Sequence, residues 1–167
     1  MFNQLFTAAE EGDETAVRRL LSGGCDVNAR GEYNNNTALM EASWEGHLGV
    51  VRALLEGGAD VQVQDDDGST ALMRAAVEGQ MEVLRVLLAH GAAVDHVDSD
   101  GCTAMMYAAG FDHLPCVLEL LGRGADPGVR DSAGRTACDE ARQVDHTAVV
   151  QTLEEAGRRG RWRLHGE

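Results

Sequence analysis

Apolar residues in this chain occur in pairs that recur at helical spacing. Between residues 48 and 56 the pairs are Val50-Val51 and Leu54-Leu55, which share one face because residues four apart are neighbours on an α-helix. The pattern returns at Val83-Leu84 with Leu87-Leu88, at Cys116-Val117 with Leu120-Leu121, and at Val149-Val150 with Leu153. Each of these stretches predicts a helix with one buried stripe.

A shorter, alanine-rich segment precedes each apolar stretch. Residues 38–45 are rich in helix formers, and the Gly46-His47 step interrupts them before the next helix. The small pairs Ala42-Ser43, Ala75-Ala76 and Ala108-Ala109 would let neighbouring helices approach closely. The repeating element is therefore predicted to be a helix, a tight turn and a second helix.

The same unit repeats at a fixed period. Thr37, Thr70, Thr103 and Thr136 stand 33 residues apart, and each opens a short helical segment. Asp67-Gly68 and Asp100-Gly101, shortly before two of these threonines, predict the tip of a hairpin-like loop. A period of this length indicates a solenoid, whose core is buried between neighbouring units. The expected fold class is all-α, a solenoid of about five helix-turn-helix units with projecting β-hairpin-like loops.

We expect a single domain over residues 1–157, followed by a basic C-terminal tail over residues 158–167. In the final unit the small pair becomes Ala141-Arg142 and the second apolar residue of a pair becomes Glu154, which puts charge where no further unit would cover it. The expected units span residues 1–28, 29–62, 63–95, 96–128 and 129–157.

The chain resembles the ankyrin repeat family from residue 2 to about residue 157. The matching stretches are Gly68-Ser69-Thr70-Ala-Leu-Met, Ala42-Ser-Trp-Glu-Gly46-His47-Leu and Gly24-Cys-Asp-Val-Asn28. The resemblance implies a non-enzymatic scaffold that binds a protein or peptide and needs no cofactor. Two departures are Asp112 and Asp145, which replace the glycine of the interhelical turn; we expect both to adopt the left-handed backbone that aspartate tolerates.

The resemblance also implies a concave groove, lined by the loop tips and the exposed stripe of each first helix. Helical spacing places Glu41, Trp44 and Glu45 together on a face that packing does not use. Four of the seven aromatic residues lie at groove positions, where they would act either as anchors for a partner or as fillers between adjacent helices. The predicted partner-binding residues are Tyr33, Asn34, Asn36, Glu41, Trp44, Glu45, Asp66, Asp67, Arg74, Val77, Glu78, Asp100, Tyr107 and Phe111.

The charge balance is strongly acidic. The chain has 28 carboxylates against 14 arginines, and its formal net charge is −14. This favours a partner segment with basic residues, and it disfavours nucleic acid and anionic membranes. Asp65-Asp66-Asp67 could suggest a cation site, but three adjacent carboxylates lack the alternation of a calcium loop, so a solvated acidic tip is predicted. No metal or cofactor is expected.

Other classes of function remain open at this stage. A thiol enzyme could use Cys102, although the sequence places no obvious base beside that residue. An engineered or idle scaffold is a further alternative. With no apolar signal core and no run of about 18 apolar residues, we expect a soluble monomer in the cytoplasm, with the nucleus as a second compartment.

Overall fold

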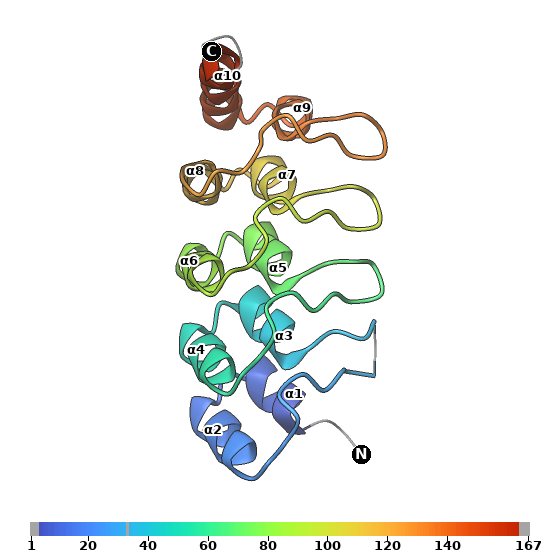
Figure 1. Cartoon of the computed structure of the whole chain (residues 1–167), viewed down its shortest axis with the longest axis vertical. Coiled ribbons are helices and arrows are strands. Elements are labelled where there is room, and N and C mark those ends of the chain that lie inside the picture. Colours follow the sequence, from blue (N-terminus) through green and yellow to red (C-terminus); the bar gives the residue numbers. More distant parts are fainter. Residues whose placement is uncertain (1–3, 33, 164–167) are drawn as a thin grey trace.

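The computed structural model describes residues 4–32 and 34–163, and it shows five helix pairs stacked along one long axis (Figure 1). The described residues contain no strand, only an isolated bridge between Arg30 and Thr37. The expected all-α solenoid is therefore confirmed. Its helices are α1 Gln4–Glu10, α2 Glu14–Ser22, α3 Ala38–Glu45, α4 Leu48–Glu56, α5 Ala71–Val77, α6 Met81–Ala89, α7 Ala104–Gly110, α8 Leu114–Gly122, α9 Ala137–Gln143 and α10 Thr147–Arg163.

The repeated threonine starts the first helix of four units. Each threonine has an extended backbone, and its hydroxyl accepts a hydrogen bond from the backbone N–H three residues later. That N–H has no partner inside the helix, so the side chain satisfies it and marks the helix start. The caps are Thr37, Thr70, Thr103 and Thr136, ahead of α3, α5, α7 and α9.

The core lies between the units and runs the length of the array. The first helices pack on one another in the order α1, α3, α5, α7 and α9, and the second helices form a parallel row behind them. Ala42, Ala75 and Ala108 are fully buried, so the small side chains do allow the close approach that the sequence predicted. Leu54, Leu84 and Leu120, one on each of the three middle second helices, are fully buried in the same core.

The turn between the two helices of a unit is hydrogen-bonded to the preceding unit. At this turn a side chain of one unit contacts a backbone carbonyl at the end of the preceding first helix. The contacts are His47 Nε2 to Glu10 O at 3.0 Å, Gln80 Nε2 to Trp44 O at 3.2 Å, His113 Nε2 to Val77 O at 2.9 Å and His146 Nδ1 to Ala109 O at 3.0 Å. Asp112 and Asp145 have φ values of 62° and 59° in these turns, which confirms the left-handed backbone expected of them.

The loops between units project to one side of the array (Figure 1). Each of the last three loops closes on itself through a backbone hydrogen bond, such as Asp65 N to Ser69 O at 3.0 Å. Adjacent loops are also joined, because Ser99 N donates to Asp67 O and Ser132 N donates to Asp100 O. The loop tips therefore form a continuous rim beside the row of first helices.

The last helix is longer than the sequence suggested. α10 continues to Arg163, so residues 158–163 of the predicted tail extend a helix that also packs on α8 and α9. Arg142 of α9 donates to Glu154 of α10 at 2.9 Å, which places both charges at the end of the array. Residues 164–167 lie outside the described part of the chain.

Candidate functional site

A groove of about 540 Å³ lies between the loop rim and the first helices α3, α5 and α7. A second cavity of about 330 Å³ continues it toward α9, and the two share Asp100, Tyr107 and Phe111. The larger cavity is lined by Trp44, Asp67, Ser69, Met73, Arg74, Val77, Asp98, Ser99, Asp100, Tyr107 and Phe111. Seven of the predicted site residues thus lie on one surface: Trp44, Asp67, Arg74, Val77, Asp100, Tyr107 and Phe111.

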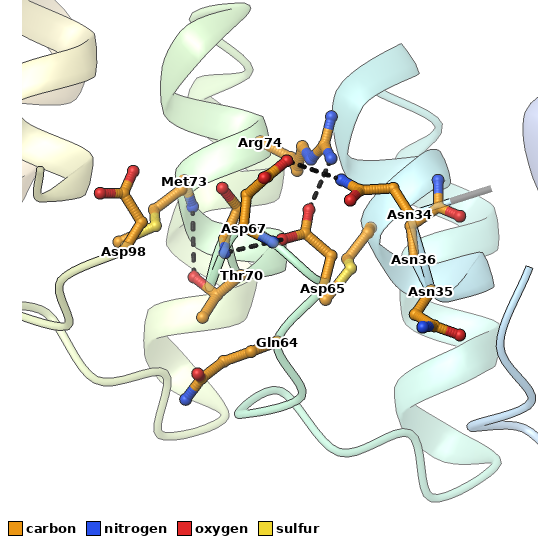
Figure 2. Close-up of polar contacts among 12 residues, drawn as sticks. Asn34, Asn35, Asn36, Gln64, Asp65, Asp67, Thr70, Met73, Arg74 and Asp98 are labelled. Carbon is orange, nitrogen blue, oxygen red and sulfur yellow. Dashed lines mark hydrogen bonds and ion pairs between the residues drawn. The ribbon is translucent and has the colours of Figure 1, made fainter. Parts of the chain in front are cut away.

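Asp65 connects the loop that precedes α5 to α5 itself, the middle of the three first helices along this groove (Figure 2). Its Oδ1 accepts hydrogen bonds from the backbone N–H groups of Asp67 at 3.0 Å and Ser69 at 2.9 Å. Its Oδ2 accepts a 2.6 Å hydrogen bond from Arg74 on α5. The Asp65 side chain is 0% exposed, so the predicted solvated tip is wrong for this residue, although Asp66 and Asp67 are exposed. The Asp65 carboxylate therefore holds both the loop tip and the Arg74 side chain in place.

Arg74 is held from a second direction by Trp44. Its guanidinium carbon lies 5.4 Å from the centroid of the Trp44 ring, within the range of a cation–π interaction. Arg74 belongs to one unit and Trp44 to the preceding one, so this contact crosses the boundary between units. The guanidinium is therefore a fixed part of the groove wall.

In the next unit an aspartate at the equivalent position binds a different side chain. Asp98 stands 33 residues after Asp65, and its Oδ1 accepts from the N–H groups of Asp100 and Cys102. Its Oδ2 accepts a 2.5 Å hydrogen bond from the Tyr107 hydroxyl. Burial, followed by this hydrogen bond, raises the pKa of Tyr107 above its ordinary value. The Tyr107 phenol is thus a neutral donor fixed in place at the groove floor.

The final unit completes the series with Asp131. Its Oδ1 accepts from the N–H groups of Ala133 and Arg135, and its Oδ2 accepts from the Arg135 side chain at 2.9 Å. These hydrogen bonds lower the pKa of the Asp131 carboxyl. Sequence reasoning missed Asp65, Asp98 and Asp131, although their common position five residues before three of the four repeated threonines was visible.

The other predicted residues lie beside the groove and do not line its cavity. Asn34 and Asn36 donate hydrogen bonds to Asp67 and Glu41, and so tie the first loop tip to its neighbours. Burial, and next the charge of Glu10, raises the pKa of Glu41. Glu45, Asp66 and Glu78 are exposed. Tyr33 lies outside the described residues.

Cys102 lies in the second cavity, where its surroundings disfavour a thiolate. Burial, and then the charges of Asp98 and Asp131, raises the pKa of Cys102 to about 11. The thiolate is the nucleophilic form, so a thiol enzyme would need the opposite shift.

We therefore expect slow alkylation of Cys102. Near pH 8 its thiolate fraction should be roughly 100-fold below that of an ordinary cysteine thiol, because its pKa of about 11 stands above the usual value of 9.0. Iodoacetamide labelling followed by peptide mass spectrometry, with an unstructured cysteine peptide as the reference, measures the ratio. Labelling of Cys102 at or above the reference rate would contradict this assignment and revive the thiol-enzyme alternative.

Two other kinds of feature, a metal centre and a membrane-spanning helix, are absent from the described residues. No three His, Cys, Asp or Glu side chains in this part of the chain gather closely enough to hold a metal ion. Of the helices described, none has both the length and the apolar character needed to cross a bilayer.

Comparison with known families identifies the class of protein. A family model described as ankyrin repeats (3 copies) matches residues 2–65 and 54–131, which together cover more than half of the chain. The chain therefore belongs to the ankyrin repeat family, whose members are generally modules for protein–protein interaction. A search of curated proteins found no match.

Proposed function

We propose that this protein is a non-enzymatic interaction module that binds a peptide or protein segment in its groove. The observation that carries the proposal is Phe111, a residue 56% exposed that lines both cavities. A large apolar ring costs free energy when water surrounds it, and exposed aromatic residues in a concave surface are typical binding anchors. Trp44, Val77 and Tyr107 extend the apolar surface on either side.

The charge of the groove supports a partner segment with basic residues. Asp67, Asp98 and Asp100 line the larger cavity, and Arg74 is the one cation among the eleven side chains that line it. Because Arg74 is already paired with Asp65, the groove retains a negative potential. Basic side chains would be attracted to this rim, and the attraction would weaken as salt is added.

The proposal is tested by selecting peptides from a random display library and measuring their affinity for purified variants. We expect enriched peptides that combine basic and apolar residues. Phe111→Ala should weaken their binding by about 2 kcal/mol, roughly 30-fold in Kd, because an anchor loses its buried area. Fluorescence anisotropy with labelled peptides measures the change.

Leu118→Ala provides the matched control. Leu118 is also a large apolar side chain, 52% exposed, but it lies on α8, in the second row of helices. Its substitution should leave the affinity unchanged. The proposal fails if no peptide is enriched, or if enriched peptides bind the Phe111→Ala variant as tightly as they bind the original protein.

A further inference from the structure

The second cavity exists because one side chain is missing from a repeated position. Trp44, Val77 and Gly110 stand 33 residues apart, on the face of the first helix that borders the groove. Trp44 and Val77 fill this position in their units, whereas Gly110 leaves it open. A Cβ atom placed on Gly110 would meet no heavy atom within 4 Å. We call the resulting 330 Å³ cavity the Gly110 pocket.

The Gly110 pocket combines aromatic and acidic groups. Tyr107 and Phe111 contribute rings, Met106 contributes a buried apolar side chain, and Asp100 and Glu140 contribute carboxylates. Its volume is at the lower end of the range of ligand sites, about 300–1,000 Å³, which suits one long side chain. The lining residues are Asp100, Cys102, Met106, Tyr107, Gly110, Phe111, Arg135 and Glu140.

The charges around the Gly110 pocket favour a cation. Arg135 lines it, but this guanidinium is paired with Asp131 at 2.8 Å and lies 3.1 Å from Glu140 Oε1. Glu140 Oε1 is buried and forms no hydrogen bond, because its contact with Arg135 is not aligned for one. The Glu140 side chain is 23% exposed and lines the pocket, so its carboxylate adds negative charge to the pocket wall, although Oε1 itself is covered. The raised pKa of Cys102, caused by burial and then by four neighbouring carboxylates, reports the same negative field.

The groove already holds one arginine in comparable surroundings. Arg74 lies against the Trp44 ring and donates to the buried carboxylate of Asp65. A guanidinium is planar and delocalised, so it can stack face to face on a ring while its N–H groups reach a carboxylate in the same plane; a lysine ammonium is a point charge with no planar face to stack. The Gly110 pocket offers the same two kinds of partner, an aromatic face and carboxylates, and the one cation in its wall, Arg135, is already paired with Asp131.

We infer that the Gly110 pocket receives an arginine side chain of the bound segment, with the guanidinium against Phe111 or Tyr107 and its N–H groups directed at Asp100 and Glu140. The identity of the bound segment rests on the proposed function, whereas the preference of the pocket for a guanidinium is a property of this chain alone. Gly110 makes the space available, since a side chain as large as valine would occupy part of it.

The test is a titration of the ¹⁵N-labelled protein with Nα-acetyl-arginine amide, followed by NMR. Shifts should concentrate at the backbone amides of Cys102, Gly110 and Phe111. The neutral analogue Nα-acetyl-citrulline amide, which has a nearly identical shape, should cause none. Gly110→Val should abolish the shifts around the pocket, since it fills the space as Val77 does one unit earlier. Gly122→Val, at the last residue of α8, where a Cβ is equally unobstructed, should leave them intact.

Glu140→Gln gives a second test that keeps the pocket open. It removes one charge with little change in size, and it should weaken binding of the arginine amide at least tenfold. The inference is overturned if the arginine amide causes no shifts at millimolar concentration, if citrulline amide causes the same shifts, or if Gly110→Val leaves them unchanged.

These results separate the pocket from the proposed function. If selected peptides bind the Gly110→Val variant as tightly as the original protein, the groove binds peptides but the arginine assignment is wrong. If arginine amide binds at the pocket and no peptide is enriched, the pocket stands and the proposed function fails.

Discussion

Replacing Asp65 by alanine is expected to lower the free energy of unfolding by about 3 kcal/mol. The substitution removes the acceptor of two backbone N–H groups and of the Arg74 side chain. A partly buried guanidinium would then lack its carboxylate, and the loop tip would lose the contacts that close it. The value is at the lower end of the range for buried ion pairs because Arg74 is 25% exposed, so water can replace part of the interaction.

Urea unfolding followed by circular dichroism measures this loss, and Asp66→Ala is the matched control. Asp66 is the adjacent residue of the same loop, but it is exposed, and its carboxylate accepts a hydrogen bond from Asn35 at the surface. Its substitution should change the free energy of unfolding by less than about 0.5 kcal/mol. Equal effects of the two substitutions would show that Asp65 contributes no more than a surface charge.

The arrangement of the helices could be predicted from the sequence because its signals are local or periodic. The spacing of the threonines fixes the unit, and the apolar pairs fix which helical faces are buried. The backbone of Asp112 and Asp145 followed from the resemblance to the ankyrin repeat family, in which glycine stands at this turn, together with the tolerance of aspartate for a left-handed conformation. None of these inferences needed to know which side chains meet in space.

The parts of the groove that could not be predicted depend on contacts between a loop and a helix or between two units. Asp65 precedes Arg74 by nine residues, and the loop must fold back before their side chains can meet. Three adjacent aspartates gave no sign that the first is buried while the next two are exposed. Trp44 was expected on the groove face, but its stacking with Arg74 depends on how close the next unit lies.

The Gly110 pocket illustrates the same limit. The sequence shows a glycine at a groove position, but a missing side chain can produce either a cavity or a closer approach of neighbouring elements. In the structure the missing side chain leaves a cavity, because the unit that follows places Glu140 and Arg135 at the edge of the space and does not fill it. In a repeat protein, a position where one unit has a different side chain from the others is therefore a good place to look for a binding site.

Leu84→Ala is expected to lower the free energy of unfolding by about 3–4 kcal/mol. Leu84 is 0% exposed in α6 of the central unit, and its removal leaves a cavity in the continuous core to which both rows of helices contribute. In a linear array each unit is stabilised by its neighbours, so a weakened central unit also weakens the units on either side. Urea unfolding measures the loss, and hydrogen exchange should show faster opening in all five helix pairs.

Leu153→Ala separates this coupling from a simple loss of core volume. Leu153 is 2% exposed, so the same side chain is removed from an equally buried site, but α10 belongs to the final unit and has neighbours on one side only. Faster exchange should then be confined largely to α9 and α10, while α1 to α6 keep their protection. If Leu84→Ala instead accelerated exchange only in α5 and α6, the units would be independent, and a groove built across their boundaries would lack the rigidity that a preformed binding surface requires.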